Sequence, residues 1–481
     1  MIMGSTHIDS YIRRLFRWSG EESLYLLIIS VIYLLFSFYN IFYYPIYIDE
    51  SLTYEWFTSR GFVSSITYYP EPNNHVLFSL ITNVFDYLPL PSLLKLRLPN
   101  LIIGYGSVLL TYRYLKNEFG HKKTVIPHCL FTFSYAITFY TVFARGYMLL
   151  IFSVLLGLIF LLKLIKEYDR KYVIAYGLCC IIGFCSHPLF LYAFVSFSIV
   201  LVINYQAFII RQMRDIILSK LLVIVSTGIF YSPILYFNGL RSLTSNNAIE
   251  KRKLEGLDDF FANLFNNYDN IFGIKSRALI IALMLGVGLS WFLQKRFRKE
   301  VVIVIVMLIS PYIFSLFQGV LLSPRYLLYL IFPITLGVAI LLFVIQEHLK
   351  VNKVIIYLIC LLGVLFQIHV FKTTNPKAAI HRDLAGLQLF NSIDFDKKDT
   401  MKAFFDFNSE TAYEFFTLNY YLKSDKPQIK LDTILGTLNS KQFAEQDLLI
   451  LNKKSNLKSD VLNNFIFVAN IDSYLIYERS K

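Results

Sequence analysis

The feature that most constrains this chain is a series of long apolar runs separated by polar stretches. Runs such as Leu24–Phe42, Leu189–Ile203 and Val301–Phe317 approach the roughly 20 helical residues that cross a bilayer core of about 30 Å. Only 16% of the 481 residues are charged, whereas a soluble domain carries about 25%. Most of the chain therefore does not face water, and the sequence predicts a polytopic α-helical membrane protein with about eleven transmembrane helices.

The expected spans alternate with loops that differ in charge. They cover residues 24–43, 97–112, 124–143, 147–164, 172–187, 189–206, 218–237, 277–294, 300–318, 327–346 and 353–371. Every second loop is rich in lysine and arginine, beginning with Arg13, Arg14 and Arg17 before the first span. Basic loops mark the cytoplasmic side, so residues 1–23 are expected in the cytoplasm. The odd number of spans then places residues 372–481 outside.

Two long loops interrupt the membrane domain, which covers residues 24–371, on its outer side. Residues 44–96 contain two amphipathic stretches, 52–60 and 76–87, that are typical of helices lying along a membrane surface. Residues 238–276 carry the basic cluster 251–253. Basic residues on this side run against the orientation rule, so either they are functional or the loop is long enough to escape the rule.

The tail, residues 372–481, alternates strand-like and helix-like segments. These are Met401–Phe407, Ser409–Leu422, Asp447–Leu451, Phe465–Asn470 and Tyr474–Tyr477. Short apolar runs such as Leu448–Leu451 indicate buried strands. The sequence predicts a small extracytoplasmic α/β domain.

An acidic pair, Asp49-Glu50, follows the first span at the outer face. Adjacent carboxylates at a membrane boundary are costly unless they are solvated or used. They are either a simple interfacial stop signal or a general base with a supporting acid.

Further candidates lie in short outer turns: Arg145 and Tyr147, then His187, then Arg325 and Tyr326. Taken alone, an arginine there snorkels to headgroups and a histidine serves the fold. Arginine is also suited to phosphate oxygens. Because all these residues are expected on the same membrane face, together they predict an active site for an anionic, lipid-linked substrate.

The order of these features resembles the glycosyltransferase C superfamily, especially its protein O-mannosyltransferase and lipid A aminoarabinose transferase branches. The matching segments are Asp49-Glu50 with Tyr54 and Gly61, Asn73-Asn74-His75-Val76-Leu77, Arg97-Leu98-Pro99, Arg145-Gly146-Tyr147, Ser186-His187-Pro188 and Pro324-Arg325-Tyr326. Relatives often have a His-Pro-Pro-Leu-like segment where this chain has His75-Val76-Leu77. The resemblance covers about residues 24–340, and a small soluble domain after the last span also occurs in relatives.

The resemblance implies a membrane glycosyltransferase that takes a hexose or pentose from a polyprenyl- or dolichyl-phosphate donor. The sugar passes to an acceptor hydroxyl, with inversion, at the outer face. Asp49 is then expected to be the base, with Glu50 positioning it or the acceptor. Arg145 and Arg325 are expected near the leaving phosphate, with His187 and the 251–253 cluster as further candidates. Residues that would shape the sugar and lipid site are Asn74, His75, Tyr147 and Tyr326.

The partners expected from this interpretation are the lipid-linked donor, membrane lipids and a glycan, lipid or protein acceptor, as in cell-envelope glycosylation at an inner or plasma membrane. Nothing in the sequence favours nucleic acid. No cofactor is required, and a divalent metal is left open. The alternative is a transporter or flippase for a lipid-linked sugar. Transporters place their sites near the midplane between inverted repeats, and the sequence contains no such repeat.

Overall fold

The computed structural model describes residues 20–69, 74–244 apart from 205 and 207, 254, 256–272, 277–348, scattered positions between 358 and 393, 401–405, 412–425, 429–432, 448–452, 465–471 and 474–479. Residues 1–19, Asn73, the 251–253 cluster and most of the expected span 353–371 lie outside the described residues.

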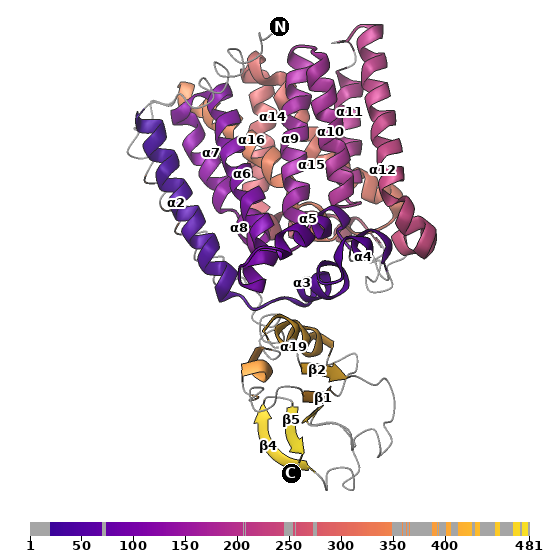
Figure 1. Cartoon of the computed structure of the whole chain (residues 1–481). Helices are drawn as coiled ribbons and strands as arrows, with labels where there is room; N and C mark the ends of the chain where they lie inside the picture. Colours follow the sequence, from indigo (N-terminus) through magenta and orange to yellow (C-terminus); the bar gives the residue numbers. More distant parts are fainter. Residues whose placement is uncertain are drawn as a thin grey trace, which may run out of the picture.

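A bundle of long helices forms the bulk of the molecule (Figure 1). Its helices are α2 (Gly20–Tyr43), α6 (Ser92–Phe119), α7 (His121–Phe133), α8 (Tyr135–Val142), α9 (Tyr147–Lys166), α10 (Arg170–Ser186), α11 (Phe190–Ile203), α12 (Ile210–Thr244), α14 (Arg277–Leu293), α15 (Arg298–Gln318) and α16 (Ile331–His348). Each of the first ten expected spans coincides with one of these helices or, for residues 124–143, with the pair α7 and α8.

Six of the described helices are long and apolar enough to cross a membrane, or seven elements if the bent pair α7–α8 is one span. The expected spans 172–187, 189–206 and 277–294 correspond to shorter helices, α10, α11 and α14. The chain is thus a polytopic helical protein, and the count of eleven spans stays a prediction.

The pair α7–α8 bends by 45° at Ser134. Ser134 has an extended backbone, and its hydroxyl oxygen accepts a hydrogen bond from Ile137 N at 3.4 Å. A serine side chain that caps a new helix start competes with continuation of the preceding helix. The apolar run at 124–143 therefore forms two helices, and α8 leads toward the outer turn at residues 143–147.

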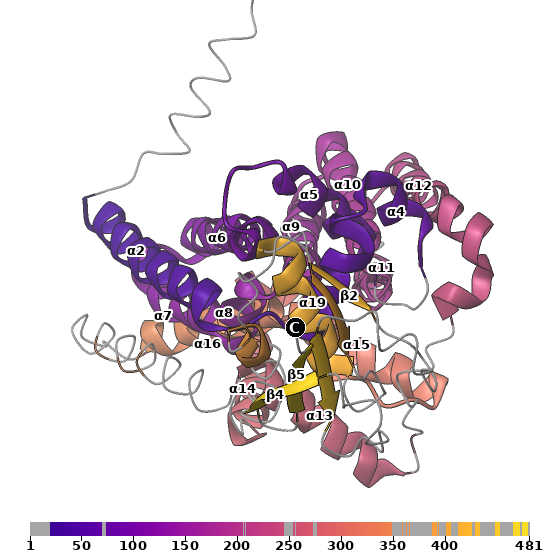
Figure 2. The same ribbon diagram turned by 60° about the horizontal axis from the view of Figure 1, so that its bottom comes forward.

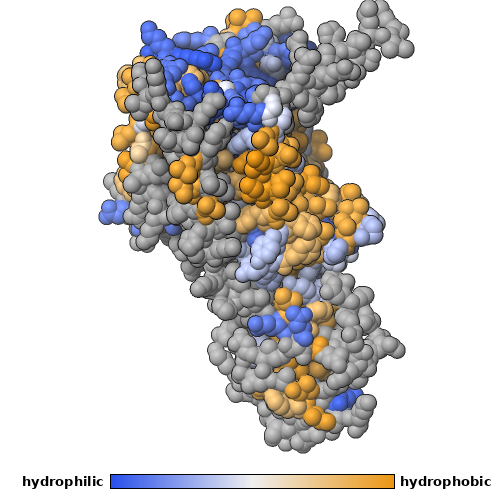
Figure 3. Space-filling view, turned by 90° about the vertical axis from the view of Figure 1, so that its left-hand side faces the viewer, coloured by the Kyte–Doolittle hydropathy of each residue, from blue (hydrophilic) through white to orange (hydrophobic). Residues whose placement is uncertain are grey.

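The helices differ in how much of their surface meets other parts of the protein. In the most apolar window of α9 and α16, 78% of the residues are buried, against 17% in α12. The exposed residues of α12 are large and apolar, for example Leu221, Leu222 and Ile229. Figure 3 shows the opposite side of the bundle, the side of α2, where hydrophobic residues gather around the middle, at the level where a bilayer core would lie.

Charged side chains gather at the bundle end away from the tail, where Figure 3 shows a hydrophilic zone. There Lys166 Nζ lies 2.7 Å from a carboxylate oxygen of Glu118 and 2.9 Å from one of Glu300, so α6, α9 and α15 are joined at their ends. Lys116 pairs with Glu22 of α2 at 2.7 Å.

Short helices cover the opposite end of the bundle (Figure 2). They are α3 (Ile48–Thr53), the π-helical turn η1 (Tyr54–Thr58), α4 (Gly61–Thr67) and α5 (Val76–Asp86). The expected surface helix 76–87 thus corresponds to α5, whereas 52–60 is divided between the end of α3 and η1. From the second long loop the structure describes α13 (Leu257–Phe272).

The C-terminal part forms a five-stranded sheet together with helix α19 (Ala412–Asp425). The strand order is β2-β1-β3-β5-β4, from β1 (Met401–Phe405), β2 (Ile429–Asp432), β3 (Leu448–Asn452), β4 (Phe465–Ile471) and β5 (Tyr474–Arg479). The strands β2, β1 and β3 are parallel, and β5 is antiparallel to both of its neighbours. Within the described residues of the tail, β1, β3, β4, β5 and α19 correspond to segments expected from the sequence, whereas β2 was not expected.

Candidate active site

Glu50 is fully buried in an ion pair with Arg97 of α6. Arg97 Nη2 lies 2.6 Å from Glu50 Oε2, Arg97 Nε donates to Oε1 at 2.9 Å, and neither side chain is exposed. Arg97 also donates to the carbonyl oxygens of Ile41 and Tyr44 at 2.7 and 2.8 Å. Ala144 N donates to Glu50 Oε1 at 2.6 Å. The pair therefore joins the end of α2, the start of α3, α6 and the α8–α9 turn.

Asp49 has a different environment from its neighbour. It lies in the first turn of α3, its side chain is 32% exposed, and its Oδ2 is 3.8 Å from Arg325 Nη1. The start of α3 is itself held by Glu50, whose Oε2 accepts from Tyr47 N at 3.0 Å. Glu50 thus fixes the helix turn that presents Asp49, while the Asp49 carboxylate remains accessible.

Arg145 lies beneath α3 in the α8–α9 turn and is only 3% exposed. Its Nη1 donates to the carbonyl oxygen of Asp49 at 3.1 Å and to Thr53 Oγ1 at 3.4 Å. Its Nε is buried without a hydrogen-bond partner among the described residues. An unpaired donor on a buried cation is costly in free energy, so this nitrogen is a notable feature of the cluster.

The turn that carries Arg145 is held by Asn100 of α6. Its Nδ2 donates to the carbonyl oxygens of Phe143 and Arg145, at 2.5 and 2.9 Å. Residues three apart share one helix face, so Arg97 and Asn100 act on α3 and on the turn from the same side of α6. Sequence reasoning missed Asn100 and the pairing of Arg97 with Glu50. The sequence signal for both was the position of Arg97 and Asn100 in an apolar run, where burying a polar side chain costs free energy.

Three aromatic rings from distant segments meet next to Arg145. The His75 ring lies 4.4 Å from that of His187 and 5.0 Å from that of Tyr147, measured between centroids. Gly146 allows this approach, because a Cβ there would lie 2.8 Å from His75 Nδ1 and 2.9 Å from the Ser186 carbonyl oxygen. The glycine therefore lets the starts of α5 and α9 and the end of α10 close on one another.

Both histidines are held in the neutral form. Burial lowers the pKa of His75 well below its ordinary value, and the nearby charge of Arg145 adds to the effect. Burial, together with Arg145 and Arg325, lowers the pKa of His187 to about 3. His187 Nδ1 accepts from Leu189 N at 3.1 Å, which places the proton of the neutral ring on Nε2. The positive charge of this cluster therefore resides on the arginines.

Arg325 reaches the cluster from the short helix η4 (Pro324–Tyr326), before η5 (Leu328–Leu330). The electrostatic effects of Tyr147 and Asp49 raise the pKa of Arg325 above its ordinary value. Its side chain is 47% exposed, much more than that of Arg145. Tyr326 beside it is half-buried. The segment before η4 is held by Asn263 of α13, whose Nδ2 donates to the Leu322 carbonyl oxygen at 2.9 Å.

Asn74 joins α4 to α5 next to the site. Its Nδ2 donates to the Ser65 carbonyl oxygen at 2.8 Å, and its Oδ1 accepts from Ser79 Oγ at 2.8 Å. Asn74 is only 2% exposed and thus fixes α4 against the start of α5, next to His75. The structure therefore brings the candidate residues that it describes to one end of the bundle, with Glu50 and Asn74 committed to internal contacts, while the 251–253 cluster lies outside the described residues.

A divalent cation finds no suitable set of ligands among these residues. Within the part of the chain that the structure describes, no three His, Cys, Asp or Glu side chains are grouped so that they could hold a metal ion. Both carboxylate oxygens of Glu50 accept from Arg97, and Asp49 has arginine as its neighbour.

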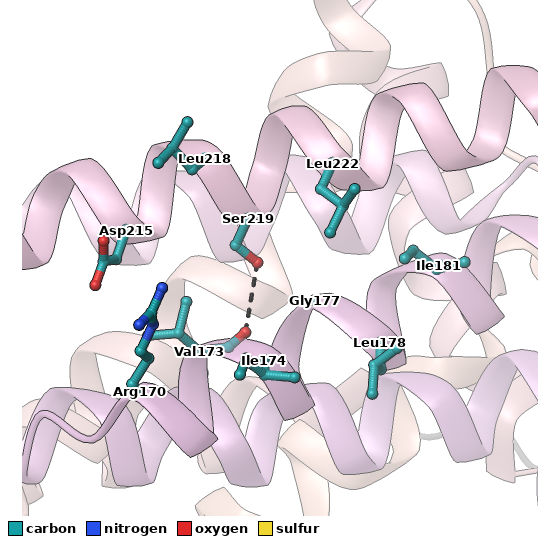
Figure 4. Close-up of a pocket in the computed structure, with 10 residues that line it drawn as sticks. All are labelled: Arg170, Val173, Ile174, Gly177, Leu178, Ile181, Asp215, Leu218, Ser219 and Leu222. Atoms are coloured by element: carbon teal, nitrogen blue, oxygen red, sulfur yellow. Dashed lines mark hydrogen bonds between the residues drawn. The ribbon is translucent and has the colours of Figure 1, made fainter.

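A groove of about 360 Å³ lies between α10 and α12, apart from this site (Figure 4). It is lined by Arg170, Val173, Ile174, Gly177, Leu178, Ile181, Asp215, Leu218, Ser219 and Leu222. None of the candidate residues borders it. Ser219 Oγ bridges the two helices by donating to the Val173 carbonyl oxygen at 3.4 Å.

No family model matches the chain, and its sequence matches no curated protein. Its fold matches the crystal structure of ArnT from Cupriavidus metallidurans in the apo state, with a TM-score of 0.60 and 11% identity over 95% of this chain and 98% of that one. ArnT bound to undecaprenyl phosphate matches with a TM-score of 0.60 and 12% identity over 94% and 97% of the two chains. The Archaeoglobus fulgidus oligosaccharyltransferase in complex with Zn and sulfate matches with a TM-score of 0.43 and 14% identity over 89% and 68%.

ArnT is the lipid A aminoarabinose transferase, a member of one of the two branches that the sequence resembles. The resemblance is therefore confirmed at the level of the fold: this chain has the fold of ArnT.

Proposed function

We propose that the protein transfers a sugar from a polyprenyl-phosphate donor to an acceptor hydroxyl, with inversion, at the outer face of the membrane. The observation that carries this proposal is the position of Asp49 between two arginines at one end of the bundle: its accessible carboxylate lies 3.8 Å from Arg325, and its backbone carbonyl oxygen accepts from Arg145. A base and a phosphate-binding pair are the two components that such a displacement needs.

In the proposed reaction Asp49 accepts the proton of the acceptor hydroxyl. The hydroxyl oxygen forms a bond to the anomeric carbon from the face opposite the phosphate. The bond from that carbon to the phosphate oxygen breaks, and its electron pair leaves with the lipid phosphate. The exposed guanidinium of Arg325 and the positive charge of Arg145 beside it stabilise the charge that develops on this phosphate.

The surroundings support this division of roles. The Asp49 carboxylate lies beside Arg325 at the surface of the site, and a carboxylate within reach of a hydroxyl can act as a general base. His75 and His187 stay neutral and, with Tyr147 and Tyr326, provide ring faces and hydrogen-bonding groups for a sugar. The fold is that of ArnT, a protein solved with undecaprenyl phosphate bound, which favours a polyprenyl phosphate as the carrier.

The test is transfer from a radiolabelled polyprenyl-phosphate sugar by the purified full-length chain, compared with its Asp49→Asn variant. Asparagine keeps the size of the side chain but cannot accept the proton, so we expect turnover to fall at least about 100-fold. Donor affinity should persist, because the phosphate contacts belong to the arginines. Normal turnover in Asp49→Asn would remove the proposed base.

The donor role of the arginines is tested in the same assay. Arg325→Ala should weaken donor binding, and Arg325→Lys should restore it only in part, because lysine lacks the bidentate fork. Chelator should leave the rate unchanged. A chain that moves the labelled lipid across vesicles but transfers no sugar would instead be the transporter.

A further inference from the structure

Helix α19 of the C-terminal part packs directly on the segment that carries Asp49. Figure 1 and Figure 2 show α19 at the end of the bundle where the short helices lie. The Tyr420 ring meets the Tyr54 ring edge to face at a centroid distance of 5.0 Å, and the Phe416 ring meets Trp56 at 6.2 Å. Tyr54 and Trp56 belong to η1, which continues α3 without a break.

Two hydrogen bonds also join α19 to the segments on either side of Asp49. Asn419 Nδ2 donates to Glu55 Oε1, and Glu55 is only 4% exposed. Ile46 N, which is fully buried just before α3, donates to the Tyr421 hydroxyl at 3.3 Å. Buried polar groups lose free energy when a partner is removed. Helix α19 therefore supplies hydrogen-bond partners to segments on both sides of Asp49.

The same helix also shields the Glu50–Arg97 ion pair. One apolar cluster contains Ile46, Phe78, Leu96, Ala144, Tyr420 and Tyr421. Leu96 precedes Arg97, and Ala144 donates its N–H to Glu50. A buried ion pair keeps its geometry only while water stays out, so the tyrosines of α19 help to hold the pair that fixes α3.

We propose that α19 is a positioning element of the transferase site, with Asn419 and Tyr421 as the residues that hold α3 and η1 so that Asp49 faces the acceptor. This inference rests on the proposed function. The C-terminal part then controls turnover and is more than a domain displayed outside the membrane.

The experiment uses the full-length protein with the double substitution Asn419→Ala and Tyr421→Phe. Hydrogen exchange of the amides in residues 46–58 should become about tenfold faster or more, because losing these bonds favours local opening. Turnover should fall about tenfold, while the KM for the donor stays within about twofold of the parent value, because a positioning residue acts on the transition state. Exchange in β3 and β5 should not change, which shows that the sheet remains folded.

The matched control is Tyr420→Phe on the neighbouring residue. The Tyr420 hydroxyl is buried without a hydrogen-bond partner among the described residues, so its removal should change neither exchange nor turnover. Unchanged exchange of residues 46–58 in the double variant would overturn the inference, and so would an equal effect of Tyr420→Phe.

The exchange measurement needs no sugar transfer, so it separates the two proposals. A chain without transferase activity would contradict the proposed function, and the exchange rates would still show whether α19 holds α3 and η1. Faster exchange with unchanged turnover in an active chain would overturn the positioning role alone.

Discussion

At the scale of single residues, Asp49 and Glu50 are neighbours in the chain with opposite environments. Glu50 is enclosed with Arg97, while about a third of the Asp49 side chain is exposed, at 32%. The difference follows from their direction on α3: Glu50 points toward α6 and the α8–α9 turn. One carboxylate therefore supports the site and the other is available for chemistry.

This division predicts that Glu50→Gln damages the fold as well as activity. Glutamine leaves the Arg97 charge buried and uncompensated, which costs about 3–5 kcal/mol. Thermal unfolding in detergent should shift down by several degrees for Glu50→Gln and stay near the parent value for Asp49→Asn. The assignment fails if the two variants unfold at the same temperature.

The two histidines predict a loss of stability in acid. In the folded protein the pKa of His187 is about 3, with burial as the first cause, whereas in the unfolded chain it is about 6.5. Below pH 6.5 the unfolded state therefore binds a proton that the folded state does not. This contribution is complete above pH 6.5 and is lost as the pH falls toward 3, by about 2 kcal/mol at pH 5.

The measurement is the unfolding temperature between pH 7 and pH 5. His187→Asn keeps an acceptor for Leu189 N but does not titrate, so the variant should lose less stability across this range than the parent. Equal slopes for the two proteins would show that His187 is not held neutral.

At the scale of elements, the site is a junction of helix ends rather than one segment. The starts of α3, α5 and α9, the end of α10 and the short helix η4 contribute its residues. Helix ends can approach closely only where side chains are small. Gly146 occupies that position between His75 and Ser186, with an ordinary backbone φ of −67°, so its importance is steric.

Gly146→Ala should therefore push this junction apart. The added Cβ would meet the His75 ring and the Ser186 carbonyl oxygen at 2.8 and 2.9 Å, and overpacking of this kind costs about 1–3 kcal/mol. We expect lower unfolding temperature and reduced transfer. Gly228→Ala is the control, because nothing lies within 4 Å of its added Cβ. Full activity in Gly146→Ala would show that the close approach of His75 and Ser186 to Gly146 is not needed for the site.

At the scale of the whole molecule, the ends of the bundle have different chemistry. The site and α19 occupy one end, and the lysine-rich contacts occupy the other. Helix α16 ends among those contacts, since Glu347 lies 4.0 Å from Lys123. The chain must therefore return to the site end between α16 and α19. The expected span 353–371 would provide this return.

The corresponding prediction is that reporters fused after Lys350 and at Lys481 read opposite sides of the membrane, with Lys350 in the cytoplasm. The basic loops place their end of the bundle inside, and the contact of α19 with α3 keeps the tail and the site together. Two cytoplasmic readings would contradict both the number of spans and the outer location of the site.

Local sequence patterns determined the helices and much of the tail. A run of apolar residues in a bilayer must satisfy its backbone internally, so most apolar runs became helices close to their expected bounds. Strand β2, only four residues long with two charged side chains, lacks such a pattern and was missed. The break at Ser134 was also not expected, because a continuous apolar run is equally compatible with one straight helix and with two helices of different direction.

The order of short polar motifs also indicated the site, because all of them follow or precede spans on the same face. Only the tertiary structure decided their roles. Glu50 is buried because Arg97, 47 residues away, reaches it, and Asn419 meets Glu55 across 364 residues. Such contacts arise from how separate helices pack and leave no local pattern in the chain. The sequence by itself therefore determined which segments form long apolar helices and which carry polar side chains, while the packing of helix ends decided which carboxylate is accessible.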